Sequence, residues 1–250
     1  MMTEKLPSPF LFSFYESLPR QGPGDEQITR LIITELLDLP KKPKIIDMGC
    51  GTGSQTRILA EMGEVIAVDI HKPFLDILMQ EAEKKCCSKH ITPLCSSMDS
   101  LPVGVNSGDL IWSEGAIYII GFERGLIYWY DLIRPGGYIV VSELTRLTDN
   151  PPKEAADFWN ITYPAVKSVA DNCQIIESAG YHCLKTLLLP SSAWDEFYAP
   201  QIEKIQIMKN NTLTDEEMAF LDEIEQEISI MQQYPDCYGY VFYVMQKPNR

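Results

Sequence analysis

A glycine-rich segment between two regular elements constrains this chain more than any other feature. Residues 47–53 are Asp-Met-Gly-Cys-Gly-Thr-Gly, after a short apolar run that starts at Lys44 and before a helical pattern from Ser54 to Met62. Glycines at this spacing let the backbone turn sharply and approach a ligand where a Cβ would collide. The segment therefore predicts a strand, a tight turn and a helix, with a ligand site at the turn.

Strands and helices alternate through the first 143 residues. We expect helices over 25–37, 54–62, 73–85 and 121–133, and strands over 44–48, 64–70, 91–95, 109–113 and 137–143. Asp25 is the expected N-cap of the first helix. This alternation is typical of βαβ units, so it predicts an α/β protein with a doubly wound parallel sheet.

The pattern changes after Glu143. A helix is expected over 168–179 and a strand over 182–189, and the last strand, 238–246, follows a long connection that lets it enter the sheet antiparallel. We therefore predict one domain over 1–250 with a seven-stranded sheet. Its expected parts are N-terminal lid helices in 1–40, a ligand-binding core in 41–145, and a C-terminal half in 146–250 with helical lid insertions at 146–167 and 191–236.

Composition and charge exclude several classes of function. The chain has 21 Lys and Arg against 35 Asp and Glu, a net charge of −14, so we expect no nucleic acid as a partner. It contains no apolar run of membrane-spanning length, and its first 20 residues lack the features of a secretory signal. The seven cysteines show no C-x-x-C spacing, so we expect reduced thiols, no metal site and a cytoplasmic monomer or homodimer without membrane partners.

Acidic residues follow the second and third predicted strands. Asp69 ends the second strand, twenty residues after Gly49, where a carboxylate can accept hydrogen bonds from both hydroxyls of a ribose. Met98 and Asp99 lie just past the third strand, where an aspartate can bind an adenine amino group and a methionine can pack on the ring. Together with the glycine-rich turn, these residues indicate an adenosine-type ligand.

The chain resembles the class I S-adenosylmethionine-dependent methyltransferases over about residues 44–143. The resemblance rests on four motifs in the family's order: residues 47–53, Asp69, Asp99 and the Leu-Ile-Arg-Pro-Gly-Gly turn at 132–137. It implies a Rossmann-like sheet and S-adenosylmethionine as cofactor. The cofactor-binding residues that it implies are Asp47, Gly49, Gly51, Gly53 and Gln55 around the turn, Asp69 on the ribose, Met98 and Asp99 at the adenine, and Ser113 near the sulfonium.

Two further segments narrow the resemblance. Residues 20–24, Arg-Gln-Gly-Pro-Gly, and residues 112–118, Trp-Ser-Glu-Gly-Ala-Ile-Tyr, are similar to a subgroup of stand-alone microbial small-molecule methyltransferases. Its members do not indicate one substrate. Gln21 carries donors that can reach a carboxylate, so we expect this N-terminal segment to close over bound cofactor.

The candidate catalytic residues are Glu114, Tyr118 and Glu143, which lie at or just beyond predicted strand ends. Methyl transfer is an in-line displacement, in which a carboxylate can serve as a base or pair with a cationic substrate. The segments expected to cover this edge contain Tyr15, Tyr118, Trp159, Tyr163, Trp194 and Tyr198. Carboxylates with aromatic walls suit an amine-bearing small molecule, whereas the alternative places these aromatic residues in the core.

Other functions remain open at this point. A methyltransferase for protein or RNA is disfavoured by the net charge and by the lack of an appended recognition domain. A nucleotide-binding oxidoreductase of similar fold is disfavoured because Ser54 occupies the third glycine position of the dinucleotide fingerprint. A binding protein that has kept the fold without catalysis is not excluded by any residue.

Overall fold

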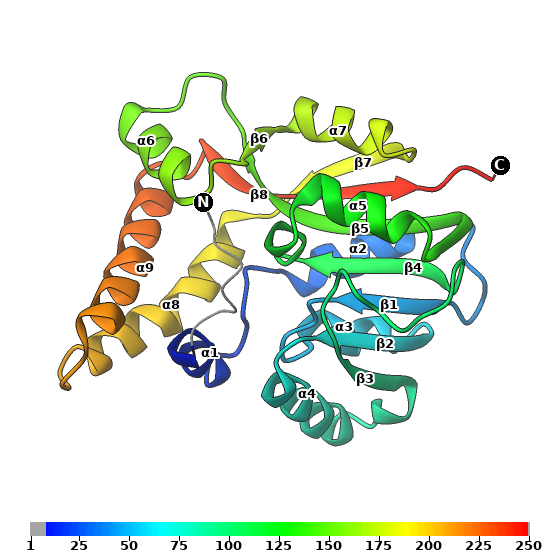
Figure 1. Ribbon diagram of the computed structural model, residues 1–250, viewed down its shortest axis with the longest axis horizontal. Helices are drawn as coiled ribbons and strands as arrows, with labels where there is room; N and C mark the ends of the chain where they lie inside the picture. Colours follow the sequence, from blue (N-terminus) through cyan, green and yellow to red (C-terminus); the bar gives the residue numbers. More distant parts are fainter. Residues whose placement is uncertain (1–8, 250) are drawn as a thin grey trace.

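The computed structural model describes residues 9–249, so the first eight residues of the expected N-terminal lid lie outside it (Figure 1). The strands of the described chain are β1 (Lys44–Met48), β2 (Glu64–Asp69), β3 (Ile91–Cys95), β4 (Gly108–Glu114), β5 (Ile133–Arg146), β6 (Lys167–Ser168), β7 (His182–Leu188) and β8 (Tyr238–Gln246). Seven of them form one sheet in the order β3-β2-β1-β4-β5-β8-β7, and the short β6 pairs with β5.

The direction of the strands confirms the predicted doubly wound sheet. Strands β1 to β5 run parallel to their neighbours, while β8 lies antiparallel between β5 and β7. β5 is longer than the predicted 137–143, because it pairs with β8 over nine residues, from Tyr138 to Arg146.

The helices of the described chain are α1 (Pro9–Glu16), α2 (Glu26–Thr34), α3 (Ser54–Leu59), α4 (Lys72–Lys84), α5 (Phe122–Tyr130), α6 (Lys153–Thr162), α7 (Val169–Ser178), α8 (Ser191–Met208) and α9 (Asp215–Gln233), with 3₁₀ turns at Ser88–His90 and Ile117–Ile119. Asp25 caps α2 as predicted, because its carboxylate accepts a hydrogen bond from the Ile28 N–H at 2.9 Å. The expected helical region 191–236 divides into two helices, since Thr214 and Glu217 form a capping box that starts α9.

Both faces of the sheet are covered by helices. Ile45 and Ile46 are adjacent in β1, but Ile45 packs in the cluster with α2, α3 and α4, and Ile46 packs in the cluster with α5 and α7. This alternation follows from the two-residue period of a strand. No helix within residues 9–249 is long and apolar enough to cross a membrane.

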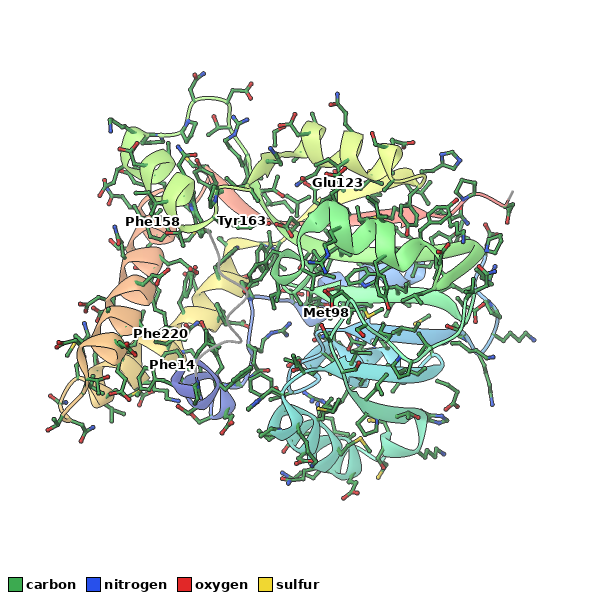
Figure 2. The ribbon with its side chains drawn as sticks, in the orientation of Figure 1. Phe14, Met98, Glu123, Phe158, Tyr163 and Phe220 are labelled. Carbon is green, nitrogen blue, oxygen red and sulfur yellow. The ribbon has the colours of Figure 1, made fainter. Side chains whose placement is uncertain are left out.

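A third apolar cluster brings α1, α6, α8 and α9 together. In Figure 1 these helices lie beside the ends toward which the parallel strands point. Figure 2 shows Phe14 of α1 next to Phe220 of α9, with ring centroids 5.5 Å apart. The N-terminal helix and the C-terminal insertion therefore cover the same edge of the sheet, as expected of lid elements.

Candidate functional site

The glycine-rich turn, residues 49–53, connects β1 to α3 in a conformation that requires glycine. Gly49 has φ +68°, and a Cβ at this position would lie 2.4 Å from the Ala116 Cβ and 3.1 Å from the Met98 Sδ. Gly53 has φ +79°, and its Cβ would lie 1.9 Å from Leu78 Cδ1. Glycine at these two positions therefore lets the turn adopt its left-handed conformation and pack closely against Ala116, Met98 and Leu78.

Asp47, in β1, supports this turn through hydrogen bonds from the start of α3. Its carboxylate is fully buried and accepts hydrogen bonds from Thr56 Oγ1 at 2.5 Å and from Gln55 Nε2 at 3.2 and 3.3 Å. Burial raises the pKa of Asp47 to about 7, although these hydrogen bonds lower it. Asp47 and Gln55 thus hold the turn together, and their direct contact with a cofactor stays a prediction.

Asp69 lies at the end of β2, beside the glycine turn. Its Oδ2 accepts a hydrogen bond from the Gly51 N–H at 2.9 Å, and its Oδ1 accepts one from the His71 N–H at 2.8 Å. Burial raises the pKa of this carboxyl above its ordinary value, against the effect of these backbone donors. The structure thus brings Asp69 and the turn together, as the ribose prediction requires.

Met98 and Asp99 are placed differently. Met98 is buried against Gly49, next to the turn (Figure 2). The Asp99 carboxylate accepts hydrogen bonds from Arg124 Nη2 at 2.7 Å and from Ser97 Oγ at 2.6 Å. A ligand that binds Asp99 shares this carboxylate with an exposed arginine.

Gln21 lies on the glycine turn. Its Oε1 accepts hydrogen bonds from the N–H and the hydroxyl of Thr52, both at 2.9 Å, and its Nε2 donates to the carbonyls of Tyr15 and Leu18 at 3.2 Å. The 20–24 segment therefore contacts the predicted cofactor site, in the place where we expect it to close.

Glu114 ends β4 and is engaged by protein groups on both oxygens. Its Oε1 accepts hydrogen bonds from Thr29 Oγ1 at 3.0 Å and Trp112 Nε1 at 2.9 Å, and its Oε2 pairs with Arg20 Nη2 at 3.1 Å. Burial raises the pKa of Glu114, and Arg20 lowers it. Glu114 therefore holds the 20–24 segment in place through Arg20, and its catalytic role stays a prediction.

Ser113, the residue before Glu114, is fully buried in β4. Its hydroxyl has no hydrogen-bond partner within residues 9–249. An unpaired buried hydroxyl costs free energy, which a ligand with a polar atom at this place would recover. The predicted role of Ser113 near the sulfonium stays open on this observation.

Glu143 lies in the second half of β5 and has one free oxygen. The residue is 2% exposed, its Oε1 accepts a hydrogen bond from the Tyr163 hydroxyl at 2.6 Å, and its Oε2 has no partner among the described residues. Burial raises the pKa of Glu143 to about 8, against the effect of Tyr163. Figure 2 shows Tyr163 between α6 and the sheet.

A second carboxyl, Glu227 of α9, is turned toward the same region and was not predicted. Its Oε1 accepts a hydrogen bond from the Tyr198 hydroxyl at 2.9 Å, and burial raises its pKa to about 7. Glu227 lies in an acidic stretch, but it follows Ile224 by three residues and precedes Met231 by four, and both of these are buried. This position on the apolar face of a helix was the available signal.

Tyrosines surround the two carboxyls. Tyr118 contacts the Tyr163 ring at 5.9 Å, and desolvation, then the charges of Glu227 and Glu143, raise the Tyr118 pKa to about 12. Tyr118 is 37% exposed, so its desolvated hydroxyl lies at an opening. We name the region the acidic chamber and define it by Glu143, Glu227, Tyr15, Tyr118, Tyr163, Tyr198 and Tyr240.

The remaining predicted aromatic residues divide between this chamber and the core. Trp194 contacts Tyr198 and Tyr240 with ring centroids 5.5 and 5.0 Å away. Trp159 packs against Phe158 and Tyr238 inside the third cluster, which is the core position that the alternative gave these aromatic residues. Its ring fills space between α6 and β8.

A cavity of about 630 Å³ adjoins the acidic chamber. Tyr198, one of the residues that define the chamber, lines this cavity together with its neighbour Trp194. Met231 and Tyr238 are also among the lining residues. None of its lining residues belongs to the glycine turn. Within residues 9–249, no group of three or more His, Cys, Asp or Glu side chains could hold a metal ion.

Comparison with known proteins agrees with this geometry. Residues 45–137 match a family model described as a methyltransferase domain. A phosphoethanolamine N-methyltransferase of Triticum aestivum is 25% identical over 174 residues, which cover 67% of this chain and 34% of that protein. A ubiquinone/menaquinone biosynthesis C-methyltransferase of Haemophilus ducreyi is 23% identical over 155 residues, which cover 60% of each protein. The chain thus spans less than two thirds of the length of either relative.

A solved structure extends the likeness to nearly the whole fold. The S-adenosylmethionine-dependent methyltransferase from Geobacter sulfurreducens, in complex with S-adenosyl-L-homocysteine, superposes with a TM-score of 0.77 at 16% identity. The match covers 96% of this chain and 99% of that one. Residues 45–137 thus match a methyltransferase domain, and nearly the whole chain has the fold of an S-adenosylmethionine-dependent methyltransferase, which agrees with the resemblance found in the sequence.

Proposed function

We propose that this chain transfers a methyl group from S-adenosylmethionine to a small-molecule acceptor. The observation that carries the proposal is that the glycine turn with Asp69 and the acidic chamber lie at the same edge of the sheet. In open α/β sheets, ligands bind at the carboxyl ends of the strands, which is the edge that these groups share.

The residues around the turn fit the cofactor. Gly49 and Gly53 let the turn pack against Ala116 and Leu78, and the backbone of Gly51 faces Gln21 Oε1, the group that would move for a ligand. Asp69 would hold the ribose, while Met98 and Asp99 would meet the adenine. Gln21 Oε1, which accepts hydrogen bonds from Thr52, would accept one from the ligand's amino group, and Gln21 Nε2 would donate to its carboxylate.

Bound S-adenosylmethionine would supply an electrophilic methyl group on a sulfonium. The chain's part is to hold the accepting atom about 3–3.5 Å from that methyl, in line with the bond that breaks, and to exclude water. The third cluster of α1, α6, α8 and α9 provides the cover, and Glu143 provides a buried carboxyl that can accept a proton.

The acceptor that fits is small. The side chains that define the chamber are buried or half-buried except for Tyr118, and the net charge of −14 opposes binding of RNA or DNA. The relatives described above are named as an N- and a C-methyltransferase, so they leave the accepting atom open. We further propose a cytoplasmic monomer or homodimer that needs no metal.

The test is a screen of metabolite extracts with S-adenosylmethionine that carries a labelled methyl group. We expect label in at least one small molecule, and none in reactions with heat-inactivated protein. In parallel, calorimetry measures the binding of S-adenosylhomocysteine to the protein. A folded protein that binds no S-adenosylhomocysteine at millimolar concentration would contradict the proposal.

A further inference from the structure

Three acidic residues are buried at this edge of the sheet, Asp47, Glu114 and Glu143, and among these and the half-buried Glu227 only Glu114 is paired with a cation within residues 9–249. Glu114 has Arg20 at 3.1 Å. Glu143 and Glu227 form no ion pair within residues 9–249, and the groups that act on them are tyrosine hydroxyls and, for Glu227, the charge of Glu223. A carboxylate removed from water without a partner is costly, so two such groups together indicate a missing positive charge.

Glu143 shows where that charge would lie. Its Oε2 is buried and lacks a donor among the described residues, while its Oε1 is bound to Tyr163. Both Glu143 and Glu227 raise the pKa of the same two hydroxyls, those of Tyr118 and Tyr240, after desolvation. Glu143 on β5 and Glu227 on α9 therefore both act on Tyr118 and Tyr240, and the contacts of the Trp194 ring with Tyr198 and Tyr240 connect the partner of Glu227 to this pair.

The aromatic residues of the acidic chamber suit a cation. Tyr118 and Tyr163 meet edge to face at 5.9 Å, and Trp194 packs on Tyr240 at 5.0 Å. A Cβ at Gly115, the residue after Glu114, would lie 3.0 Å from the Tyr240 ring, so this ring adjoins the end of β4. Aromatic faces attract ammonium groups, most strongly where water is excluded.

We propose that the methyl acceptor carries an amine, which binds as an ammonium ion between Glu143 and Glu227 in the acidic chamber. This inference rests on the proposed methyl transfer. The ammonium ion gives one proton to the Glu143 carboxylate and becomes a neutral amine. The nitrogen lone pair then forms the bond to the methyl carbon, the carbon–sulfur bond breaks, and its electron pair stays on sulfur. The product is the N-methylated ammonium ion.

The two carboxyls have different tasks in this step. Glu143 has a pKa of about 8 in the empty site, close to the value at which a general base works best near neutral pH. Glu227 remains hydrogen-bonded to Tyr198 and pairs with the charge of the ammonium ion. The cavity next to Trp194 and Tyr198 accommodates the rest of the acceptor.

The first test measures binding of a cation to protein saturated with S-adenosylhomocysteine. The probe is tetramethylammonium chloride, and its neutral counterpart of similar size is tert-butyl alcohol, both followed by saturation-transfer NMR at constant ionic strength. We expect tetramethylammonium to bind at least tenfold more tightly than the alcohol. Equal binding of the two would overturn the inference.

Variants locate the site. Glu143→Gln and Glu227→Gln keep the shape of the side chain but cannot carry its negative charge, so each should weaken tetramethylammonium binding at least tenfold above pH 8, where both carboxyls are ionised. Glu216→Gln, an exposed substitution in the first turn of the same helix, should leave it unchanged. Calorimetry with S-adenosylhomocysteine verifies that each variant is folded. Wild-type cation affinity in both chamber variants would overturn the inference.

A second test separates this inference from the proposed function. Purified amines, alcohols, thiols and phenols are offered with labelled S-adenosylmethionine. Methylation of amines, with turnover reduced about 10²-fold in Glu143→Gln at unchanged cofactor affinity, supports the inference. Methylation of neutral acceptors alone overturns it and leaves methyl transfer intact. Failure to bind S-adenosylhomocysteine contradicts methyl transfer itself, and the inference with it.

Discussion

The guanidinium of Arg20 lies 3.1 Å from the carboxylate of Glu114, across 94 positions of sequence. The pair joins the segment before α2 to the end of β4, and it leaves no room beside it: a Cβ at Gly24 would lie 1.8 Å from Arg20 Nη2. Because Gln21, the next residue, contacts the glycine turn, the Arg20–Glu114 pair positions the segment that covers the predicted cofactor site.

Breaking this pair should destabilise the protein. Arg20→Gln leaves the nearly buried Glu114 without its cation, so we expect the free energy of unfolding to fall by roughly 3 kcal/mol. Urea unfolding measures this loss. The control is Arg30→Gln, which removes exposed ion pairs to Glu26 and Glu61 and should lower the free energy of unfolding much less than Arg20→Gln does. Equal losses in the two variants would contradict the role of Arg20.

Asp69→Ala should weaken cofactor binding. The substitution removes a charge-assisted acceptor for ribose hydroxyls and frees the Gly51 N–H that Asp69 now holds, so we expect a loss of roughly 1.5–3 kcal/mol in S-adenosylhomocysteine affinity. Calorimetry makes the comparison. Asp76→Ala, which removes an exposed ion pair to Lys72, should bind like the wild type. Unchanged affinity in Asp69→Ala would refute the ribose assignment.

Cofactor binding should slow hydrogen exchange in residues 10–24. This region reaches the site through Gln21 on Thr52 and through Phe12, which stacks on His71 at 4.0 Å beside Asp69. A ligand held between these contacts and the turn would reduce local opening. Exchange followed by mass spectrometry, with and without S-adenosylhomocysteine, tests the closure. Identical exchange in both states would leave the segment as a static turn.

Stability should fall as the pH rises from about 4.5 to about 8. Glu143 keeps its proton in the folded protein up to a pKa of about 8, whereas the unfolded chain loses it near 4.5. Over this interval the folded state binds more protons, so each such group lowers the free energy of unfolding by up to about 1.4 kcal/mol per pH unit. Below the interval both states are protonated and the loss is absent.

The Glu143→Gln variant isolates this effect. It removes one titrating group, so stability should decline less steeply with pH than in the wild type, while Asp47 and Glu227, each with a pKa of about 7, keep part of the slope. Urea unfolding at several pH values provides the slopes, with Glu216→Gln as the exposed control. Parallel slopes in wild type and Glu143→Gln would show that Glu143 titrates normally.

The predictions that succeeded depend on neighbours along the chain. The apolar runs and glycines of residues 44–53 predict a strand, a turn and a helix, and the structure confirms all three. Asp69 follows the next strand and meets the turn, because adjacent parallel strands end at the same edge of a sheet. The cap of α2 at Asp25 is equally local.

What the sequence did not decide concerns side chains whose partners come from distant segments. Glu114 and Glu143 are both strand-end acids, and the sequence did not distinguish them. Arg20 neutralises the first, and the second lies among tyrosines. Trp159, which the sequence placed either at the site or in the core, packs in the core, and Glu227 was not expected and lies in the chamber.

The sequence by itself determined the order of strands and helices and the glycine turn, because strand periodicity, helix caps and glycine conformations depend on residues a few positions apart. Only the tertiary structure decided which buried acid has a cation and which does not. That difference arises when α1, α8 and α9 pack over the sheet edge and remove Glu143 and Glu227 from water. The desolvation that sets their charge is a property of the assembled fold and of no single segment.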